Sequence, residues 1–223
     1  MTLPSNYSAN KARVSSIVDR LFPFWWEDLR RFKNWLKSKK IDYDAYMLEA
    51  SSAGTFIHKQ LEDHAMGYYN EEKHPVYSLL VEQGKLFMKE KGVATIETEK
   101  YVASTLFQGT IDLICQIDEE EWIVDWKSYG VAKHKWNIDS KWRKPYGKLK
   151  KATIQLSLYA YATWIQNIAV VELCKDGYHF HKLNRMTDIE VEALLTTFTN
   201  DNPIQNNKEN TPIQDTESPT WTL

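Results

Sequence analysis

The stretch "GTIDLICQIDEEEWIVDWKS", residues 109–128, sets the framework of the predicted fold. Two β-type runs flank an acidic turn, which is the pattern of a tight hairpin. Because successive side chains of a strand point to opposite faces, Asp125 and Lys127 share one face and the tryptophans take the other. With a tight turn, Asp112 of the first run lies directly or diagonally opposite Asp125 of the second.

Two facing carboxylates need compensation, since at about 4 Å they repel by ~4 kcal/mol at an effective dielectric of about 20. A shared proton, a cation or the ammonium group of Lys127 would supply it. Mg²⁺ suits oxygen ligands and keeps positions open for water and phosphate, and Lys127 would then orient or deprotonate a bound water or stabilise charge on phosphate. The alternative is an exposed strand pair with a surface ion pair, worth about 0–1 kcal/mol. The apolar run around Asp112 favours the site, because a buried unpaired carboxylate is costly.

The composition is that of one ordinary domain. The 223 residues are 43% apolar, and 28 Lys and Arg against 30 Asp and Glu give a net charge of -2, so a nucleic-acid contact requires local clustering of basic residues. No apolar run approaches the roughly 18 residues of a membrane span, and the first residues lack the apolar segment of a secretory signal. Cys115 and Cys174 are too few for a disulfide framework or a cysteine-held cluster. We therefore expect a soluble cytoplasmic protein.

The hydrophobic period changes along the chain from helix to strand and back. The expected helical segments are 15–40 with an interruption at Pro23, 44–67 with a break near Gly54, 75–91, 153–167 and 187–200. The expected β segments are 93–104, 106–118, 121–128 and two strands within 168–183. Thr187 and Glu190 have the spacing of a capping box. Residues 1–13 are expected to be loose, and the whole predicts an α/β or α+β single domain.

Three further features have spacing that suits the same site. His58 in "GTFIHKQ" is expected on a helix, where a neutral imidazole can bind a metal. Glu97 and Glu99 alternate along a β segment, so one of them can add a carboxylate. Gln155 and Tyr159 lie four apart, on one helix face. Each feature alone also fits ordinary surface or core positions.

Taken together and in order, the motifs resemble those of the RecB-type branch of the PD-(D/E)XK nucleases. The motifs that carry the resemblance are "GTFIH", "IETEKY", "GTIDL", "DWKS" and "QLSLY". That branch includes phage and mitochondrial exonucleases and CRISPR-associated adaptation nucleases. The resemblance implies a restriction-endonuclease-like core, with a central mixed sheet flanked by helices, and hydrolysis of DNA with Mg²⁺ or Mn²⁺. We expect one nuclease domain at 1–199, with a helical part at 1–53, a core at 54–199 and a disordered tail at 200–223.

The resemblance also implies roles for individual positions. The metal ligands would be His58, Glu99, Asp112 and Asp125. The catalytic residues would be Asp112, Asp125, Lys127, Gln155 and Tyr159, the last two positioning the substrate or the catalytic groups. Asp125 stands where many relatives have Glu, and two cysteines cannot form the four-cysteine iron–sulfur cluster of some relatives.

A strongly basic stretch, residues 131–151, separates two of these motifs and contains a single acidic residue, Asp139. It can be a solvated loop, but its position between two motifs of one site favours contact with phosphates, and its aromatic residues can stack on unpaired bases. The predicted DNA-binding residues are Lys133, Lys135, Trp136, Lys141, Trp142, Arg143, Lys144, Tyr146 and Lys148.

These patterns predict a Mg²⁺- or Mn²⁺-dependent deoxyribonuclease, with an exonuclease favoured by resemblance alone. The expected substrate is DNA, at ends or single strands, in recombination, repair or processing within a bacterial or phage-infected cytoplasm. A recombination or replication protein is a possible partner. Two alternatives stay open: a structure-specific endonuclease or nickase, and a catalytically idle DNA-binding module.

Overall fold

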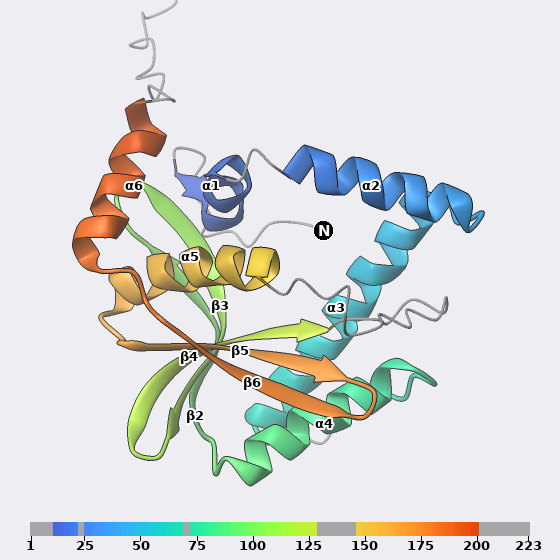
Figure 1. Cartoon of the computed structure of the whole chain (residues 1–223). Coiled ribbons are helices and arrows are strands. Elements are labelled where there is room, and N and C mark those ends of the chain that lie inside the picture. The colour runs from blue at the N-terminus through green and yellow to red at the C-terminus, as the bar shows by residue number, and fades with distance from the viewer. Residues whose placement is uncertain (1–10, 22–24, 69–71, 129–145, 201–223) are drawn as a thin grey trace, which may run out of the picture.

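The computed structural model describes residues 11–21, 25–68, 72–128 and 146–200, which Figure 1 shows. The helices are α1 (Val14–Leu21), α2 (Trp25–Ser38), α3 (Tyr43–Ala65), α4 (Tyr77–Glu90), α5 (Tyr146–Thr163) and α6 (Asp188–Asn200). The strands are β1 (Ala12–Arg13), β2 (Ala94–Ala103), β3 (Phe107–Ile117), β4 (Glu120–Ser128), β5 (Asn167–Cys174) and β6 (Gly177–Leu183).

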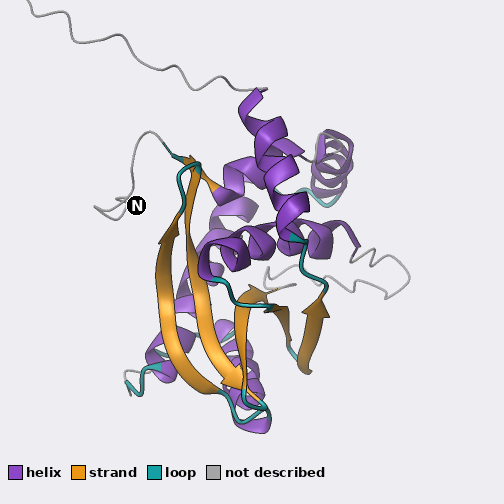
Figure 2. Ribbon diagram, turned by 90° about the vertical axis from the view of Figure 1, so that its left-hand side faces the viewer, coloured by secondary structure: helices purple, strands orange, loops and turns teal. Residues whose placement is uncertain are grey.

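All of these strands belong to one mixed sheet. Its hydrogen-bonded order is β1-β3-β4-β5-β6, and β2 pairs with β3 as well. The pairs of β3 with β2 and β4, and of β5 with β6, are antiparallel, whereas β4 and β5 are parallel. Helix α5 lies in the connection between the parallel strands, as the return path across a sheet requires. Figure 2 shows the strands as a twisted, curved sheet with helices packed around it.

Helices cover both faces of the sheet, which therefore has two hydrophobic cores. On one face α3 and α4 pack against side chains that include Leu113, Val124 and Trp126. On the other face α1, α5 and α6 pack against side chains that include Ile114 and Ile123. In Figure 1, α5 lies across the strands, and α3 and α4 lie on their other side. The predicted mixed sheet flanked by helices is confirmed, as is the packing of the tryptophan face of β4.

The hairpin of β3 and β4 is paired next to its turn and open at its other end. The pairs run from the turn as far as Leu113 opposite Val124. Gln108 pairs with β2 on the other edge of β3, so β1 must lie on the same edge as β4. There β1 pairs only with Phe107 and Gln108. No described strand pairs with residues 109–112 on this edge. The sheet is thus parted on one edge of β3, at the residues that precede and include the first predicted aspartate.

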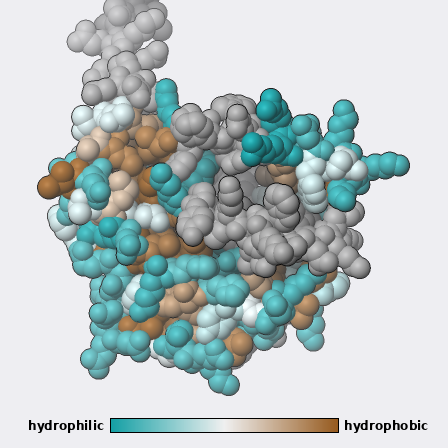
Figure 3. All heavy atoms as spheres, in the orientation of Figure 1, coloured by the Kyte–Doolittle hydropathy of each residue, from teal (hydrophilic) through white to brown (hydrophobic). Residues whose placement is uncertain are grey.

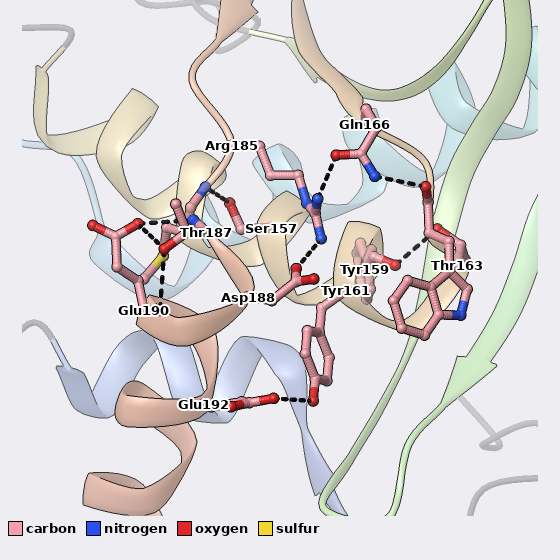
Figure 4. Close-up of polar contacts among 12 residues, drawn as sticks. Ser157, Tyr159, Tyr161, Thr163, Gln166, Arg185, Thr187, Asp188, Glu190 and Glu192 are labelled. Carbon is pink, nitrogen blue, oxygen red and sulfur yellow. Dashed lines mark hydrogen bonds and ion pairs between the residues drawn. The ribbon is translucent and has the colours of Figure 1, made fainter.

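Polar contacts join α5, the β6–α6 connection and α6, and Figure 4 shows them in detail. The Ser157 hydroxyl of α5 accepts a hydrogen bond from the Met186 backbone N–H at 3.0 Å. Arg185 donates to Gln166 at 2.6 Å and pairs with Asp188 in the first turn of α6. These contacts hold α6 against α5, so the end of the chain that the structure describes supports the helix on which Gln155 and Tyr159 were predicted.

The capping box that opens α6 is confirmed. The Thr187 backbone N–H donates to Glu190 Oε2 at 2.8 Å, and the Glu190 N–H donates to Thr187 Oγ1 at 3.3 Å. Each side chain thereby satisfies a backbone donor that the helix start would leave without a partner.

Some predicted boundaries are wrong. α3 runs straight through Gly54, because an isolated glycine in a helix interior costs only about 1 kcal/mol. Residues 12–13, expected to be loose, form β1. α5 begins at Tyr146 rather than near residue 153, since the lysine-rich run before it is compatible with a helix. α5 ends before Trp164, which has a φ of 65°, and Asn167 already belongs to β5.

Hydropathy is uneven over the surface. On the face shown in Figure 3, apolar side chains gather on the left, over α6 and the neighbouring part of α5. Among the described helices, none has the length and apolar character needed to cross a membrane. Of the predicted tail, residues 200–223, Asn200 belongs to α6, and residues 201–223 lie outside the described part of the chain.

Candidate active site

Three side chains from three elements meet where the sheet parts. His58 comes from α3, Glu99 from β2 and Asp112 from β3, and one ligand atom of each lies within 4.8 Å of the other two. Two carboxylates and an imidazole at this spacing form a donor set that suits a divalent cation. All three were predicted as metal ligands, and the structure brings them together across more than fifty residues of sequence.

The backbone of Trp126 orients two of these side chains. Its N–H donates to Asp112 Oδ2 at 2.9 Å. The carboxylate thus replaces the backbone carbonyl that would accept this hydrogen bond if β3 and β4 were still paired here. The Trp126 carbonyl accepts from His58 Nε2 at 3.2 Å. With Nε2 carrying the proton, Nδ1 faces Asp112 Oδ2 at 3.5 Å. A histidine whose second nitrogen donates to a backbone carbonyl is the usual arrangement of a metal ligand.

Glu99 reaches the cluster through an irregularity in β2. Thr98 pairs with Leu113 and Lys100 with Ile111, which places Glu99 at the level of Asp112. Glu99 has a φ of 47°, an uncommon conformation for a residue other than glycine and one that is often found at functional sites.

The other predicted carboxylate of this strand, Glu97, has a different partner. Its carboxylate pairs with Lys100 at 2.6 Å and is not part of the three-residue cluster. Of the two glutamates that alternation left open, Glu99 is therefore the one at the site.

Asp125 and Lys127 form a close pair beside the cluster. Lys127 Nζ donates to Asp125 Oδ1 at 2.8 Å and lies 2.6 Å from Oδ2. Asp125 is only 3% exposed, so the carboxylate side of this ion pair is shielded from water. The pairing register of the hairpin, continued by one residue, sets Asp125 opposite Asp112. Asp125 and Lys127 share a face of β4, as alternation predicts. Their pair lies next to the cluster of His58, Glu99 and Asp112 and is not part of it.

The charges of the cluster act on one another. Burial lowers the pKa of His58, but Asp112 and, more weakly, Asp125 outweigh this effect and raise the pKa to about 9. Burial raises the pKa of Asp112, but His58 and Lys127 outweigh that effect and hold the pKa below its usual range. Loss of hydration and the charge of Asp112 raise the pKa of Glu99 to about 7, although the residue as a whole is exposed. The metal-free cluster thus has a protonated imidazole beside an ionised carboxylate.

These observations fit a bound divalent cation. A cation would replace the proton of His58 Nδ1 and relieve the repulsion that raises the pKa of Glu99. The buried carboxylate of Asp125, which is paired with Lys127, is a further oxygen donor beside the cluster. Burial raises the pKa of Asp125 in spite of Lys127, as expected where positive charge is still lacking.

The two predicted helix residues lie on α5, over the other core from His58. Tyr159 is 5% exposed, and its ring packs on Gly109 of β3: a Cβ built there would lie 2.5 Å from Tyr159 Oη. Gln155 is half-buried, and no hydrogen bond between it and Asp112 or Lys127 is present in the described part of the chain. Tyr159 is thus tied to the open stretch of β3, and Gln155 is not tied to the cluster.

The predicted DNA-binding residues fall mostly outside the described residues. Those in the segment 129–145 are Lys133, Lys135, Trp136, Lys141, Trp142, Arg143 and Lys144. Tyr146 and Lys148 lie in the first turn of α5, where side chains are not described. Their role stays a prediction.

Sequence analysis missed two features of this region. The first is the backbone of Trp126, which leaves no signal because any residue supplies the same N–H and carbonyl. The second is Glu172 in the run "NIAVVELC" of β5, which is buried at 7% exposure. A charged residue within an apolar strand is the signal that singled out Asp112, and it applied here as well.

Solved structures of low sequence identity resemble this chain over most of their length. An alkaline exonuclease (LHK-Exo) from Laribacter hongkongensis is 14% identical, with a TM-score of 0.43, over 86% of this chain and 87% of that one. The LHK-Exo complex with dAMP is 16% identical, with the same TM-score and coverage. A phage related exonuclease from Haemophilus somnus 129PT is 13% identical, with a TM-score of 0.42, over 83% and 88% of the chains. No curated protein matches the chain.

A family model gives the stronger finding. The model of the PD-(D/E)XK nuclease superfamily matches residues 29–173, which include the three clustered residues, Asp125 and Lys127. The match covers well over half of the 223 residues. The chain belongs to the PD-(D/E)XK nuclease superfamily.

Proposed function

We propose that this protein is a deoxyribonuclease that hydrolyses DNA phosphodiesters with Mg²⁺ or Mn²⁺, and that it acts as an exonuclease. The observation that carries the proposal is the meeting of His58, Glu99 and Asp112 beside the Asp125–Lys127 pair. An idle DNA-binding module has no evident need for two facing carboxylates, one of them buried, beside a lysine. Recombination, repair or other DNA processing is the corresponding biological role, with a recombination or replication protein as a possible partner.

In the proposed hydrolysis, each residue of the site has its own role. A bound divalent ion supplies a water of lowered pKa and neutralises charge on the phosphate. Asp112 and Glu99 would hold that ion with His58 Nδ1, whose direction is set by the Trp126 carbonyl. Lys127, whose side chain is one-third exposed and whose Nζ is held by Asp125, would orient the attacking water or stabilise a phosphate oxygen as its charge grows. Gln155 and Tyr159 are proposed to position the substrate or these groups from α5.

DNA is proposed to approach the site along the basic stretch that precedes α5. That stretch follows β4, which ends one residue after Lys127. Lysines and arginine there would neutralise phosphates, and the tryptophans would stack on unpaired bases.

The test is cleavage of end-labelled linear DNA and of closed circular DNA by the purified protein with Mg²⁺, Mn²⁺ or chelator. An exonuclease degrades the linear DNA from its ends in either metal, leaves the circles intact and stops in chelator. Cutting of closed circles would replace the exonuclease with an endonuclease or nickase. DNA binding without cleavage in any metal would show an idle module.

A further inference from the structure

The polar face of the site continues across two more strands. In register, Ile123, Ile168 and Leu183 form one row over β4, β5 and β6, and this row belongs to the core under α5. Two residues further along β4 and β5, the row is Asp125, Val170 and His181.

The next row contains only polar side chains. It consists of Lys127, Glu172 and His179. Side chains of one row share a face of the sheet, so the same face changes from core to polar toward the ends of β4 and β5. Figure 1 shows these two strands ending side by side, near α3 and below the start of α5.

Glu172 and His181 are joined within this polar area. His181 Nε2 lies 3.0 Å from Glu172 Oε2, a diagonal pair between neighbouring strands. Glu172 is 7% exposed, whereas the side chain of His181 keeps 29% of its surface exposed. The carboxylate therefore lies beneath the imidazole and fixes its orientation. With the proton on Nε2 toward Glu172, Nδ1 is the nitrogen left for another partner.

Among the described residues, this pair lies outside the cluster of His58, Glu99 and Asp112, and Glu172 stands in register with Lys127 on the neighbouring strand. A carboxylate buried in an apolar strand is costly, and an oriented imidazole beside a reaction site is a common way to bind or position a charged group. His181 lies in the row of Asp125, two strands away, which is roughly 10 Å. At about 3.4 Å of axial rise per nucleotide, that distance spans at most about three nucleotides along one strand of a duplex.

We infer that His181, oriented by Glu172, binds a phosphate of the substrate strand within about three nucleotides of the cleaved bond. The inference rests on the proposed nuclease function and extends its site from β4 to β6. In the imidazolium form, Nδ1–H donates to a phosphate oxygen while Nε2–H stays on Glu172, so the contact is charge-assisted and directional. Glu172 is a positioning residue, and His181 a substrate-binding one.

The first test is steady-state cleavage by His181→Ala, with His179→Ala as the matched control. His179 is the other histidine of this face and makes no described hydrogen bond to Glu172. His181→Ala is expected to raise KM about 10-fold to 100-fold with little change in kcat, as expected for loss of uniform binding. Mn²⁺ affinity should stay the same, and circular dichroism should show a folded protein whose melting temperature is lower, because Glu172 loses its imidazole partner. Equal effects of both variants, or a loss of kcat alone, would overturn the inference.

Two further variants separate orientation from folding. Glu172→Gln keeps the shape of the side chain but loses its charge, and should raise KM less than His181→Ala does. His181→Gln keeps a donor and should restore part of the affinity. If both bind DNA as the unaltered protein does, the inference is wrong.

The sharpest test replaces single phosphates of the substrate with neutral methylphosphonates. At one position within about three nucleotides of the cleaved bond, the replacement should weaken binding by the unaltered protein but not by His181→Ala, because both changes remove the same contact. Equal weakening of both proteins at every position would overturn this inference and leave the proposed nuclease function standing. An unaltered protein that neither cleaves DNA nor binds Mn²⁺ would instead overturn the proposed function.

Discussion

The two halves of the β3–β4 hairpin share one register but have opposite characters. Next to the turn, the strands are paired as far as Leu113 and Val124, and the side chains from Leu113 to Cys115 and from Trp122 to Val124 are buried in apolar cores. Beyond that pair, Asp112 and Asp125 replace apolar residues. The Trp126 N–H donates to the side chain of Asp112 instead of to a backbone carbonyl of β3. The comparison shows where a site can form in a sheet. Where backbone hydrogen bonds between two strands end, the polar groups left there must pair with side chains or with a ligand.

The largest effect is expected from removing the polar residues of the open half. Asp112→Ala and Lys127→Ala should each lower the rate of DNA cleavage by about 10²–10⁴-fold, because one removes a metal ligand and the other a proton-donating or charge-stabilising group. The measurement is the initial rate of release of labelled nucleotides in saturating Mg²⁺. Circular dichroism should show a folded protein in both cases. Near-normal cleavage by either variant would remove that residue from the site.

The two glutamates of β2 give the next largest contrast. Glu99→Gln should weaken Mn²⁺ binding by about 10-fold to 100-fold, because it removes a carboxylate from the cluster. Glu97→Gln is the matched control, since Glu97 pairs with Lys100 at the surface. Isothermal titration with Mn²⁺ measures both. Equal affinities of the two variants would show that Glu99 is not a ligand.

Metal affinity should also depend on pH, with a sign set by His58. Asp112 raises the pKa of His58 to about 9, and the imidazole must lose its proton before Nδ1 can bind a cation. The association constant for Mn²⁺ should therefore rise about tenfold per pH unit from pH 7 to about 9. Below pH 7 it should rise more steeply, because Glu99, with a pKa of about 7, must also lose its proton.

Titrations at several pH values measure this slope. His58→Gln should remove the part of the rise caused by the imidazole and keep the part caused by Glu99, whose pKa the charge of His58 lowers. An affinity of the unaltered protein that is constant from pH 7 to 9 would contradict the placement of Nδ1 at the metal.

The smallest effects concern the packing that supports the open half. Gly109→Ala places a Cβ 2.5 Å from Tyr159 Oη and should lower the free energy of unfolding by about 1–3 kcal/mol. Gly54→Ala is the control, since its Cβ meets nothing within 4 Å in α3, and it should add up to about 1 kcal/mol. Urea denaturation measures both. A Gly109→Ala protein as stable as the original would show that the contact of Tyr159 with β3 is loose.

Local patterns predicted the elements and the paired residues, but not the geometry of the cluster. Alternation correctly joined Asp125 to Lys127, because both belong to one strand and its period is fixed. The capping box of α6 followed from Thr187 and Glu190 for the same reason, since both partners lie within one turn.

Features that depend on distant partners were beyond such patterns. The choice of Glu99 over Glu97 depends on a positive φ that no local signal announces. The two-residue strand β1 is too short to have a period, and its partner lies more than ninety residues away. The prediction that His58 joins the cluster depended on the family resemblance, because a single histidine on a helix is common at ordinary surface and core positions.

The central claim is that His58, Glu99 and Asp112 bind the divalent ion on which cleavage depends. Anomalous diffraction from crystals of the protein grown with Mn²⁺ tests it most directly. The account predicts a strong anomalous peak at coordination distance, about 2.0–2.2 Å, from His58 Nδ1 and from oxygens of Glu99 and Asp112. The peak should be missing in Asp112→Ala crystals. A peak elsewhere, such as between Glu172 and His181, with this cluster empty, would contradict the account.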